Sequence, residues 1–343
     1  MRTHPVIELS RVKFLEFVRE PEAIFWVLVF PVLLSLALGI AFRSKAPGPL
    51  TIAVCAGPGA AEAARALATD PGLHPKVLGE IEARESLRTG KVALAVIPGD
   101  TFTYWLDPAR DESRVARLAA DAALQRAAGR ADARGIAVRE MTEKGSRYID
   151  FLVPGLLGMN LMGTGMWGIG FSIVTARSRG LLKRLVATPM RKRDYLLGQM
   201  MGRMVFLIPE VAVLVGFAHA VFGVPVLGSL VALGVIASLG ALAFTGIGLL
   251  VAARPRTIEG VSGLMNFVML PMWIFSGVFF SPSRFPDAIL PLIRLLPLTA
   301  LNDALRAVMI DGAKLTSVAG ELAILAVWGV VAFAIALRLF RWQ

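Results

Sequence analysis

The sequence predicts an α-helical integral membrane protein with six transmembrane helices and an inserted small α/β extracytoplasmic domain. Apolar residues make up 56% of the 343 positions and charged residues only 18%, and the mean hydropathy is +0.66. A soluble domain averages about 45–50% apolar and about 25% charged residues. Six segments are apolar over nearly the length of a membrane span, whereas residues 43–150 are polar. This composition argues against a purely cytosolic enzyme.

The distribution of charge points to a membrane and not to a nucleic-acid surface. The chain has 36 Lys and Arg against 25 Asp and Glu, which gives a net charge of +11. Residues 151–343 contribute +9 of this excess, and their basic residues flank long uncharged runs. Such flanking is typical of membrane topology, so we expect a lipid bilayer as partner and no nucleic acid.

Cysteine and histidine are too sparse for a metal centre. Cys55 is the only cysteine, and the three histidines His4, His74 and His219 lie far apart in the sequence. A structural zinc or iron–sulfur site needs several such ligands. We therefore expect no metal site on this chain.

The first span is predicted over residues 23–42, after a cytoplasmic interfacial helix over residues 1–22. Its apolar run is longer than the roughly 7–15 residues of a signal-peptide core, which predicts a retained signal anchor. Crossing a hydrocarbon core takes roughly 20 apolar residues. Five further segments approach or exceed this length: 151–175, 195–222, 226–253, 258–280 and 318–339.

Two stretches between the spans have their own predicted structure. In residues 43–150, short apolar runs at 50–55 and 92–97 predict strands, and residues 60–68, 80–88 and 112–128 predict helices. This alternation predicts a small α/β domain, in which Cys55 is expected to be inert core. Residues 281–312 contain several prolines within an apolar stretch, which predicts a re-entrant segment on the outer side.

Orientation follows from the basic loop at residues 176–194. Seven Lys and Arg residues lie between positions 177 and 193, so the loop is expected in the cytoplasm. Alternation then places both termini in the cytoplasm and residues 43–150 outside. The location expected is the bacterial cytoplasmic (inner) membrane.

The same loop carries an ordered apolar pattern. Leu181 with Leu185, and Leu182 with Val186, are spaced as neighbours on one helix face. Thr188 followed by Pro189 predicts the start of another helix, with the Thr188 hydroxyl as its N-cap. A topological charge cluster explains the basic residues equally well, but the apolar spacing favours a docking element for a partner.

These residues resemble a known family. The runs YIDFLVPGLLG at 148–158, GLLKRLVATP at 180–189 and LGQ at 197–199 resemble the membrane subunit of type-2 ATP-binding cassette exporters, in the subgroup with a large extracytoplasmic domain after span one. The resemblance implies two permease subunits forming the pathway and two ATPase subunits docking beneath them. It implies a coupling helix whose contact residues are Gly180, Leu181, Leu182, Arg184, Leu185, Thr188 and Pro189.

In such exporters a separate subunit hydrolyses ATP, which agrees with the absence of a phosphate-binding loop from this sequence. No G-x-x-x-x-G-K-[ST] phosphate-binding loop occurs in the 343 residues. We therefore expect no enzymatic activity on this chain, with ATP and Mg bound by the partner ATPase.

Ionisable residues inside a span are costly and usually face a partner or a water-filled path. Glu210, in the third span, is the first candidate for the translocation path or the dimer seam, and hydrogen bonding to another span is the alternative. Arg203 lies seven residues earlier, about 10.5 Å along the axis, and is expected to extend toward the cytoplasm instead of pairing with Glu210. Met265, Met269 and Phe275 suit a pliable apolar path, and ordinary packing explains them equally well.

The function predicted is a permease subunit, as a homodimer or with a close paralogue, that exports a hydrophobic or amphipathic compound such as a drug, lipid or secondary metabolite. The alternative is a mechanotransmitting or sensory membrane protein whose extracytoplasmic domain senses a signal and which transports nothing.

Overall fold

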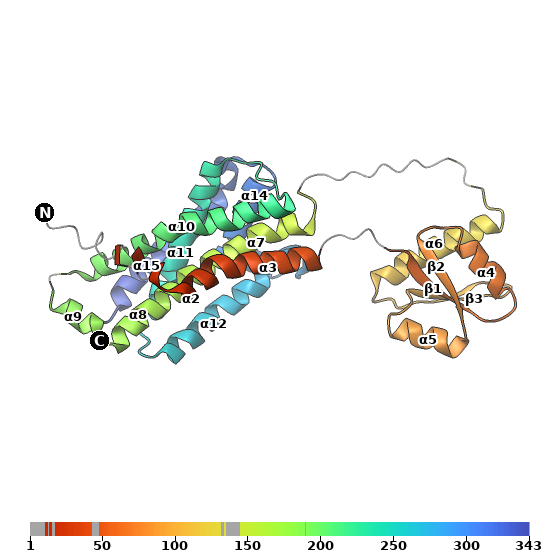
Figure 1. The fold of residues 1–343 in the computed structure, drawn as a ribbon, viewed down its shortest axis with the longest axis horizontal. Coiled ribbons are helices and arrows are strands. Elements are labelled where there is room, and N and C mark those ends of the chain that lie inside the picture. The colour runs from red at the N-terminus through yellow and green to blue at the C-terminus, as the bar shows by residue number, and fades with distance from the viewer. Residues whose placement is uncertain are drawn as a thin grey trace. The chain divides into compact units, whose positions relative to one another are not determined.

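The computed structural model describes residues 11–12, 14–15, 18–42, 48–131, 134, 145–188 and 190–342. The chain divides into two compact units, one formed by Met1–Arg43 with Thr142–Gln343 and the other by Ser44–Met141 (Figure 1). The first unit is helical and the second contains a β-sheet. The interfacial helix predicted for residues 1–22 falls largely outside the described residues, as does Pro189.

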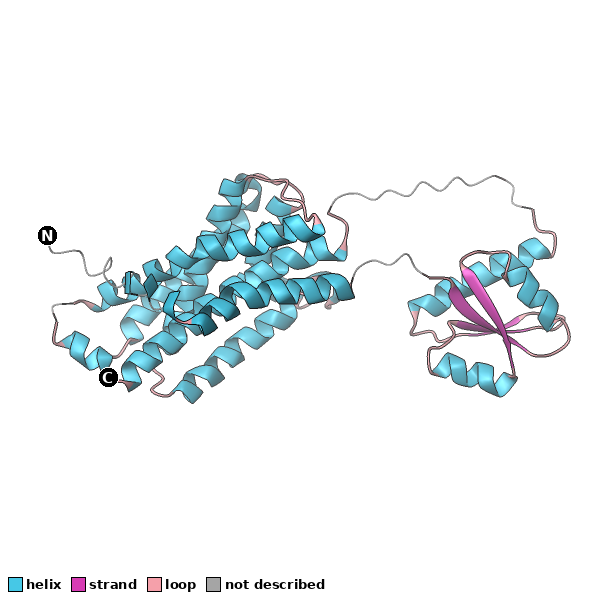
Figure 2. Cartoon of the chain, viewed as in Figure 1, coloured by secondary structure: helices cyan, strands magenta, loops and turns pink. Residues whose placement is uncertain are grey.

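The second unit has a four-stranded sheet in the order β2-β1-β3-β4 (Figure 2). β1 pairs in parallel with β2 and β3, and β4 pairs antiparallel with β3. The strands are β1 Leu50–Cys55, β2 Leu73–Leu78, β3 Leu94–Ile97 and β4 Thr103–Trp105. The helices are α4 Ala60–Leu67, α5 Glu80–Arg88 and α6 Asp111–Ala127.

Alternation of side chains along β1 builds a core on each face of the sheet. Ile52 and Val54 pack with buried residues of α4 and α6, whereas Ala53 and Cys55 pack with Ala83 of α5. This two-sided burial explains why β1 and β3 are continuous apolar runs in the sequence. The two edge strands are absent from the sequence predictions because β2 is polar and interrupted by Pro75, and β4 has three residues.

The first unit begins with two helical paths that each contain a π-helical turn. The first path consists of α2 Pro21–Ile24, the π-helical turn Phe25–Val29 and α3 Phe30–Ala41. The second consists of α7 Tyr148–Gly163, the π-helical turn Thr164–Gly168 and α8 Ile169–Ser178.

The rest of the unit is built from long helices and a broken segment. The helices are α9 Leu181–Val186, α10 Lys192–Phe222, α11 Leu230–Ala252 and α12 Ile258–Phe275. A 3₁₀ turn Pro282–Arg284, α13 Leu290–Arg294, α14 Pro297–Met309, a 3₁₀ turn Leu315–Val318 and α15 Ala319–Leu339 follow. The predicted segment 281–312 therefore contains short, broken helices.

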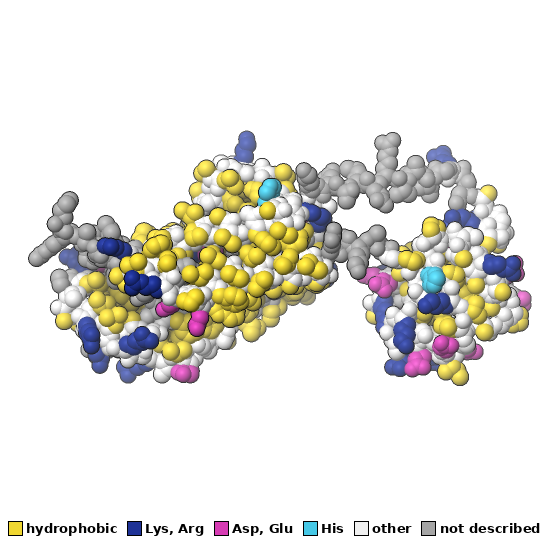
Figure 3. Space-filling model, viewed as in Figure 1, with side chains coloured by type: hydrophobic (Ala, Val, Ile, Leu, Met, Phe, Trp, Pro, Cys, Tyr) yellow, Lys and Arg dark blue, Asp and Glu magenta, His cyan; other side chains and the backbone are white. Residues whose placement is uncertain are grey.

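Within the described part of the chain, five helices are long and apolar enough to cross a membrane. They are Pro21–Ala41, Lys192–Phe222, Leu230–Ala252, Ile258–Phe275 and Leu315–Leu339. Hydrophobic side chains cover much of the visible face of this unit (Figure 3). The predicted span 151–175 lies in α7, the second π-helical turn and α8, and is not among the five. Its helix α7 is buried on most sides by protein.

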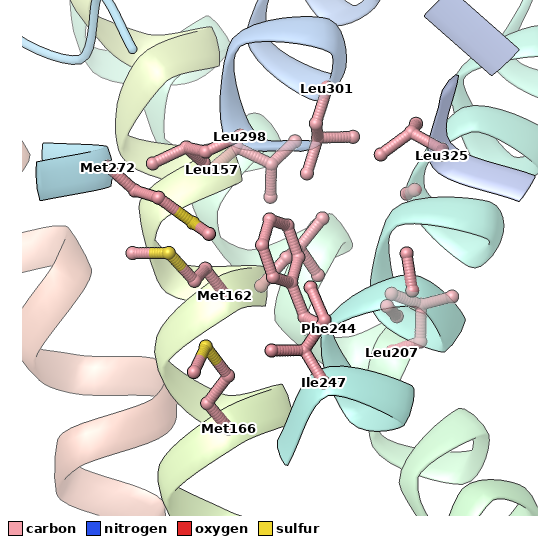
Figure 4. Close-up of a cluster of buried hydrophobic side chains, with 14 of the residues drawn as sticks. Leu157, Met162, Met166, Leu207, Phe244, Ile247, Met272, Leu298, Leu301 and Leu325 are labelled. Atoms are coloured by element: carbon pink, nitrogen blue, oxygen red, sulfur yellow. The ribbon is translucent and has the colours of Figure 1, made fainter. Parts of the chain in front are cut away.

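Helix α11 lies at the centre of the helical core. Phe244 is fully buried and packs among Leu157, Met162 and Leu298 (Figure 4). Glycines allow the neighbouring backbones to come close: a Cβ on Gly248 would lie 2.8 Å from the Gly165 carbonyl oxygen, and one on Gly246 would lie 3.0 Å from that of Gly329. Such small-residue contacts are typical of helix packing in membranes.

Side chains from α7 and α14 fix the turn that follows α12. The Tyr148 hydroxyl donates to the Phe279 carbonyl at 2.8 Å, and the Asn302 amide donates to the Ser276 carbonyl at 2.9 Å. The guanidinium of Arg306 donates to the Gly277 carbonyl and lies over the Phe151 ring, 3.8 Å from its centre. The carbonyls of the residues that follow α12 thus have protein partners, as buried backbone groups require.

Candidate functional site

The predicted coupling helix is present as α9, a single short helix between the end of α8 and the start of α10 (Figure 1). Gly180 precedes it in the left-handed region, with φ +69°, a conformation that costs glycine little. Leu182 is fully buried in the helical core and Leu185 is half-buried against it. Leu181 and Val186 are 49% and 51% exposed. Leu182 and Leu185 therefore face the core, whereas Leu181 and Val186 lie at opposite edges of this buried face.

The remaining predicted coupling residues that the structure describes are Arg184 and Thr188. Arg184 is exposed on α9, as is Lys183 beside it. The prediction for the Thr188 hydroxyl as an N-cap is wrong: it donates to the Leu185 carbonyl at 2.6 Å, and α10 begins at Lys192 with Arg191 at its N-cap. The Thr188 hydroxyl therefore bonds to the C-terminal end of α9 and not to the first turn of α10.

Arg177, which the sequence predictions pass over, is the most connected side chain near α9. It is 8% exposed, and its guanidinium donates to the carbonyls of Ala252 and Ala253 at 3.1 Å each, at the C-terminal end of α11. It also donates to the carbonyls of Pro255 and, at 3.1 Å, Arg341. A cation is favourable there because the last carbonyls of a helix carry partial negative charge.

Glu210 is 1% exposed, and both carboxylate oxygens have partners within the protein. Arg203 donates to Oε2 at 2.5 Å, and the Thr164 hydroxyl lies 3.0 Å from Oε1. The expectation that Arg203 extends away from Glu210 is therefore wrong. Removing either charge from water is costly, so a direct pair inside the protein offsets more of that cost than separation would.

The pair belongs to a series of polar contacts that runs from α10 through the path of α7 and α8 to the path of α2 and α3. Arg203 also donates to the Thr164 hydroxyl at 2.5 Å, and that hydroxyl lies 2.8 Å from the Asn160 carbonyl. The Asn160 amide in turn donates at 3.1 Å to the carbonyl of Val27, inside the first π-helical turn. Glu210 thus hydrogen bonds to the path from α7 to α8, where a second span is predicted, and a role in the translocation path stays a prediction.

The fifth-span candidates lie on the inner side of α12. Met265 and Met269 are 0% and 1% exposed, and Met265 packs directly on Gly170 of α8. Phe275 is half-buried, with its ring centre 5.1 Å from that of Phe285. The outward face of α12 carries other apolar side chains, namely Ile258, Leu264, Phe267, Leu270 and Ile274.

A groove of about 710 Å³ runs between α10 and α11. Its lining is apolar apart from His219 and Ser238. None of the predicted path residues lines it. In the described residues, no group of three or more His, Cys, Asp or Glu side chains could hold a metal ion.

Comparison with known proteins gives a family match over most of the chain. The sequence model described as "ABC-2 family transporter protein" matches residues 21–338. ABC transporter G family member 20 of Dictyostelium discoideum is 29% identical over 172 residues, 50% of this chain and 23% of that protein. The linearmycin resistance permease protein LnrN of Bacillus subtilis (strain 168) is 26% identical over 176 residues, 51% of this chain and 46% of that protein. The matched region thus spans less than half the length of either relative. No solved structure matches the chain.

Proposed function

Because the chain belongs to the ABC-2 family of transporter proteins, we propose that it is the membrane permease of an ATP-driven exporter. A separate ATPase subunit hydrolyses ATP and docks on α9. Two permease subunits, identical or closely related, form the pathway. The membrane unit crosses the bilayer six times, with the path from α7 to α8 as its second span and residues 281–312 as a re-entrant segment on the outer side.

The orientation proposed follows from the basic residues. Lys and Arg side chains gather at the end of the helical unit that carries α9 (Figure 3). Arg191, Lys192 and Arg193 lie immediately before α10 enters the apolar region. Cytoplasmic loops carry such an excess of Lys and Arg, which supports a cytoplasmic location for α9 and both termini. The unit Ser44–Met141 then lies outside the bacterial inner membrane.

The observation that carries the proposal is the exposed face of α9. Leu181 and Val186 are apolar and half exposed on a helix whose other face, through Leu182, is held in the core. Exposed Lys183 and Arg184 lie beside them. A cationic outer face with one apolar side chain at each edge fits an acidic cleft with an apolar rim on a soluble subunit.

The cargo proposed is a hydrophobic or amphipathic compound. Support comes from the name of the Bacillus relative, a linearmycin resistance permease. Expression of the chain with its ATPase should lower the sensitivity of a host to some member of a panel of apolar toxic compounds, linearmycin included. No change across the panel would count against a role in resistance.

Co-purification tests the docking site. The tagged chain is purified from membranes in mild detergent, and ATPase that co-purifies is identified and its hydrolysis measured in vesicles. Leu181→Asp and Val186→Asp should reduce ATPase binding. Ile81→Asp is the matched control, because Ile81 is 86% exposed in the other unit. Equal ATPase binding by all variants would reject α9 as the docking site.

A further inference from the structure

The segment after α15 is held at both flanks of α9. Arg177, three residues before Gly180, donates to the Arg341 carbonyl at 3.1 Å. On the other flank, the Lys192 ammonium donates to the Phe340 carbonyl at 3.0 Å. Residues 340–342, here called the tail, therefore contact the helices on each side of the predicted coupling helix.

Aromatic side chains extend this contact. Phe340 is 1% exposed, and its ring centre lies 5.8 Å from that of Tyr195 and 5.4 Å from that of Trp342. The Arg177 guanidinium lies 5.7 Å from the Phe340 ring centre, within the range of a cation–π interaction. The tail is therefore packed as well as hydrogen bonded. We call these residues the tail cluster: Arg177, Lys192, Tyr195, Phe340, Arg341 and Trp342.

The tail cluster also contacts the end of α11. Arg177 donates to the carbonyls of Ala252 and Ala253, and the backbone amide of Arg341 donates to the same Ala253 carbonyl at 3.4 Å. Through one guanidinium, three parts of the chain meet: the end of α8, the end of α11 and the tail of α15. Within the described residues no carboxylate forms an ion pair with Arg177, so its charge is stabilised by carbonyl dipoles and by the Phe340 ring.

The geometry of Arg177 is specific to arginine. Its planar group presents donors in a fixed fork and reaches four carbonyls at once. A lysine ammonium is a point charge with three donors and cannot span the same set. The position therefore requires the guanidinium for its shape as well as its charge.

We propose that the tail cluster is the contact through which movement of α9 reaches α11 and α15, with Arg177 and Lys192 as its positioning residues. This rests on the proposed function, since α9 moves only if an ATPase subunit docks there. Without the tail cluster, movement of α9 would reach α11 and α15 only through the packing of α8 and α10 against them. With it, a displacement of either flank also pulls on the tail of α15 and the end of α11, which pack on each other through Gly246 and Gly329.

Limited trypsin digestion of the purified permease, without any ATPase, tests the contact itself. Mass spectrometry follows cleavage after Arg341, whose backbone carbonyl and amide are both held by hydrogen bonds in the tail cluster. Arg177→Lys should raise this cleavage rate by about tenfold, the factor expected from losing one hydrogen bond to a charged group. Arg179→Lys is the matched control, because Arg179 is exposed two residues away. An equal rate in both variants would overturn the contact.

A second pair of variants keeps the test decisive if Arg177→Lys fails to fold. Lys192→Gln removes the donor to Phe340 from an exposed position, and Arg193→Gln removes the same charge from the next residue, which pairs with Asp194 at 3.5 Å instead. Only Lys192→Gln should speed cleavage after Arg341. Equal cleavage would again overturn the contact.

The coupling role is measured with the ATPase present, as the number of molecules of an apolar compound from the toxicity panel that are exported per ATP hydrolysed. Arg177→Lys and Lys192→Gln should lower this ratio several-fold while the ATPase still binds and hydrolyses ATP, and both controls should keep the ratio of the unaltered protein. If a variant showed faster cleavage after Arg341 but exported as many molecules per ATP as the unaltered protein, the proposal would be overturned. If the unaltered protein bound no ATPase, the proposed function would fail and the coupling role with it, whereas the digestion would still decide the contact.

Discussion

Arg203 and Glu210 form an ion pair within a single helix, seven residues apart, with 2.5 Å between Nη2 and Oε2. Their side chains are 5% and 0% exposed. A buried pair of this kind contributes little net stability compared with apolar residues, but losing one partner leaves an uncompensated charge. The pair therefore constrains how the helix can be altered more than it stabilises the fold.

Glu210→Ala should destabilise the protein strongly, by about 3–5 kcal/mol, because Arg203 then stays buried without its counter-charge. Thermal unfolding of the detergent-solubilised protein measures the loss. The double variant Arg203→Met with Glu210→Leu should recover most of it, since both charges are gone. Unfolding of Glu210→Ala at the temperature of the unaltered protein would show that the pair has no such role.

Two glycines of α11 should respond in opposite ways to alanine. At Gly248 the new Cβ would lie 2.8 Å from the Gly165 carbonyl oxygen and 2.9 Å from the Met166 Cα, so the helices must separate. We expect a loss of about 1–3 kcal/mol. At Gly234 a Cβ meets no atom within 4 Å, so alanine should be neutral or stabilise by about 0.4–1 kcal/mol through the unfolded chain. Similar melting temperatures for the two variants would contradict the packing at Gly248.

The thiol of Cys55 should resist alkylation. Cys55 is 4% exposed, and burial, with a smaller contribution from the Glu80 carboxylate, raises the pKa of the thiol above its ordinary value. The neutral thiol is the form that the fold favours, and the thiolate is the reactive form. Because the folded state holds this proton more tightly, this contribution to stability is present below the ordinary thiol pKa and is lost as the pH rises through the folded pKa.

Maleimide labelling measures the reactivity of the Cys55 thiol. The native protein should stay unlabelled at neutral pH and label fully in urea, with Cys55→Ala as the blank. Rapid labelling of the native protein would show that Cys55 is not covered.

The orientation can then be read from new cysteines in the Cys55→Ala background. Ile81→Cys should react with a membrane-impermeant maleimide added outside intact cells, because Ile81 is 86% exposed in the unit proposed to lie outside. Arg193→Cys should react only after the membrane is opened, because it belongs to the basic loop before α10. Labelling of position 193 in intact cells would invert the topology.

Local patterns in the sequence predict much of this structure. The strand at residues 50–55 and the helix at residues 80–88 lie where they were predicted because each pattern is short, bounded by Gly or Pro and decided by neighbouring residues. The broken helices within residues 281–312 follow equally directly from proline. The match of the family over residues 21–338 agrees with the motifs that predicted a permease.

Features that depend on partners distant in the sequence were not predictable in this way. The spacing of Leu181, Leu182 and Leu185 identifies a helix face but not the core that covers part of it. Arg203 and Glu210 are separated along the axis of the helix, yet the side chain of Glu210 leans toward the N-terminus and the long arginine reaches it. From the sequence, Arg177 is indistinguishable from the other cations of the basic loop. No neighbouring residue indicates that its guanidinium donates to carbonyls up to 164 positions away.

The ring contact between Phe42 and Tyr148 has a consequence for the modularity of the chain. Their ring centres lie 4.7 Å apart, at the end of α3 and the start of α7. The polypeptide thus leaves the helical unit and returns to it at neighbouring residues. The intervening residues, about a hundred, include the whole of the unit Ser44–Met141. A few glycine and serine residues could bridge the two rings, and the helical unit would keep every contact described for α9 and its surroundings. Exchange of the unit Ser44–Met141 between members of the family would then leave the helical unit unchanged.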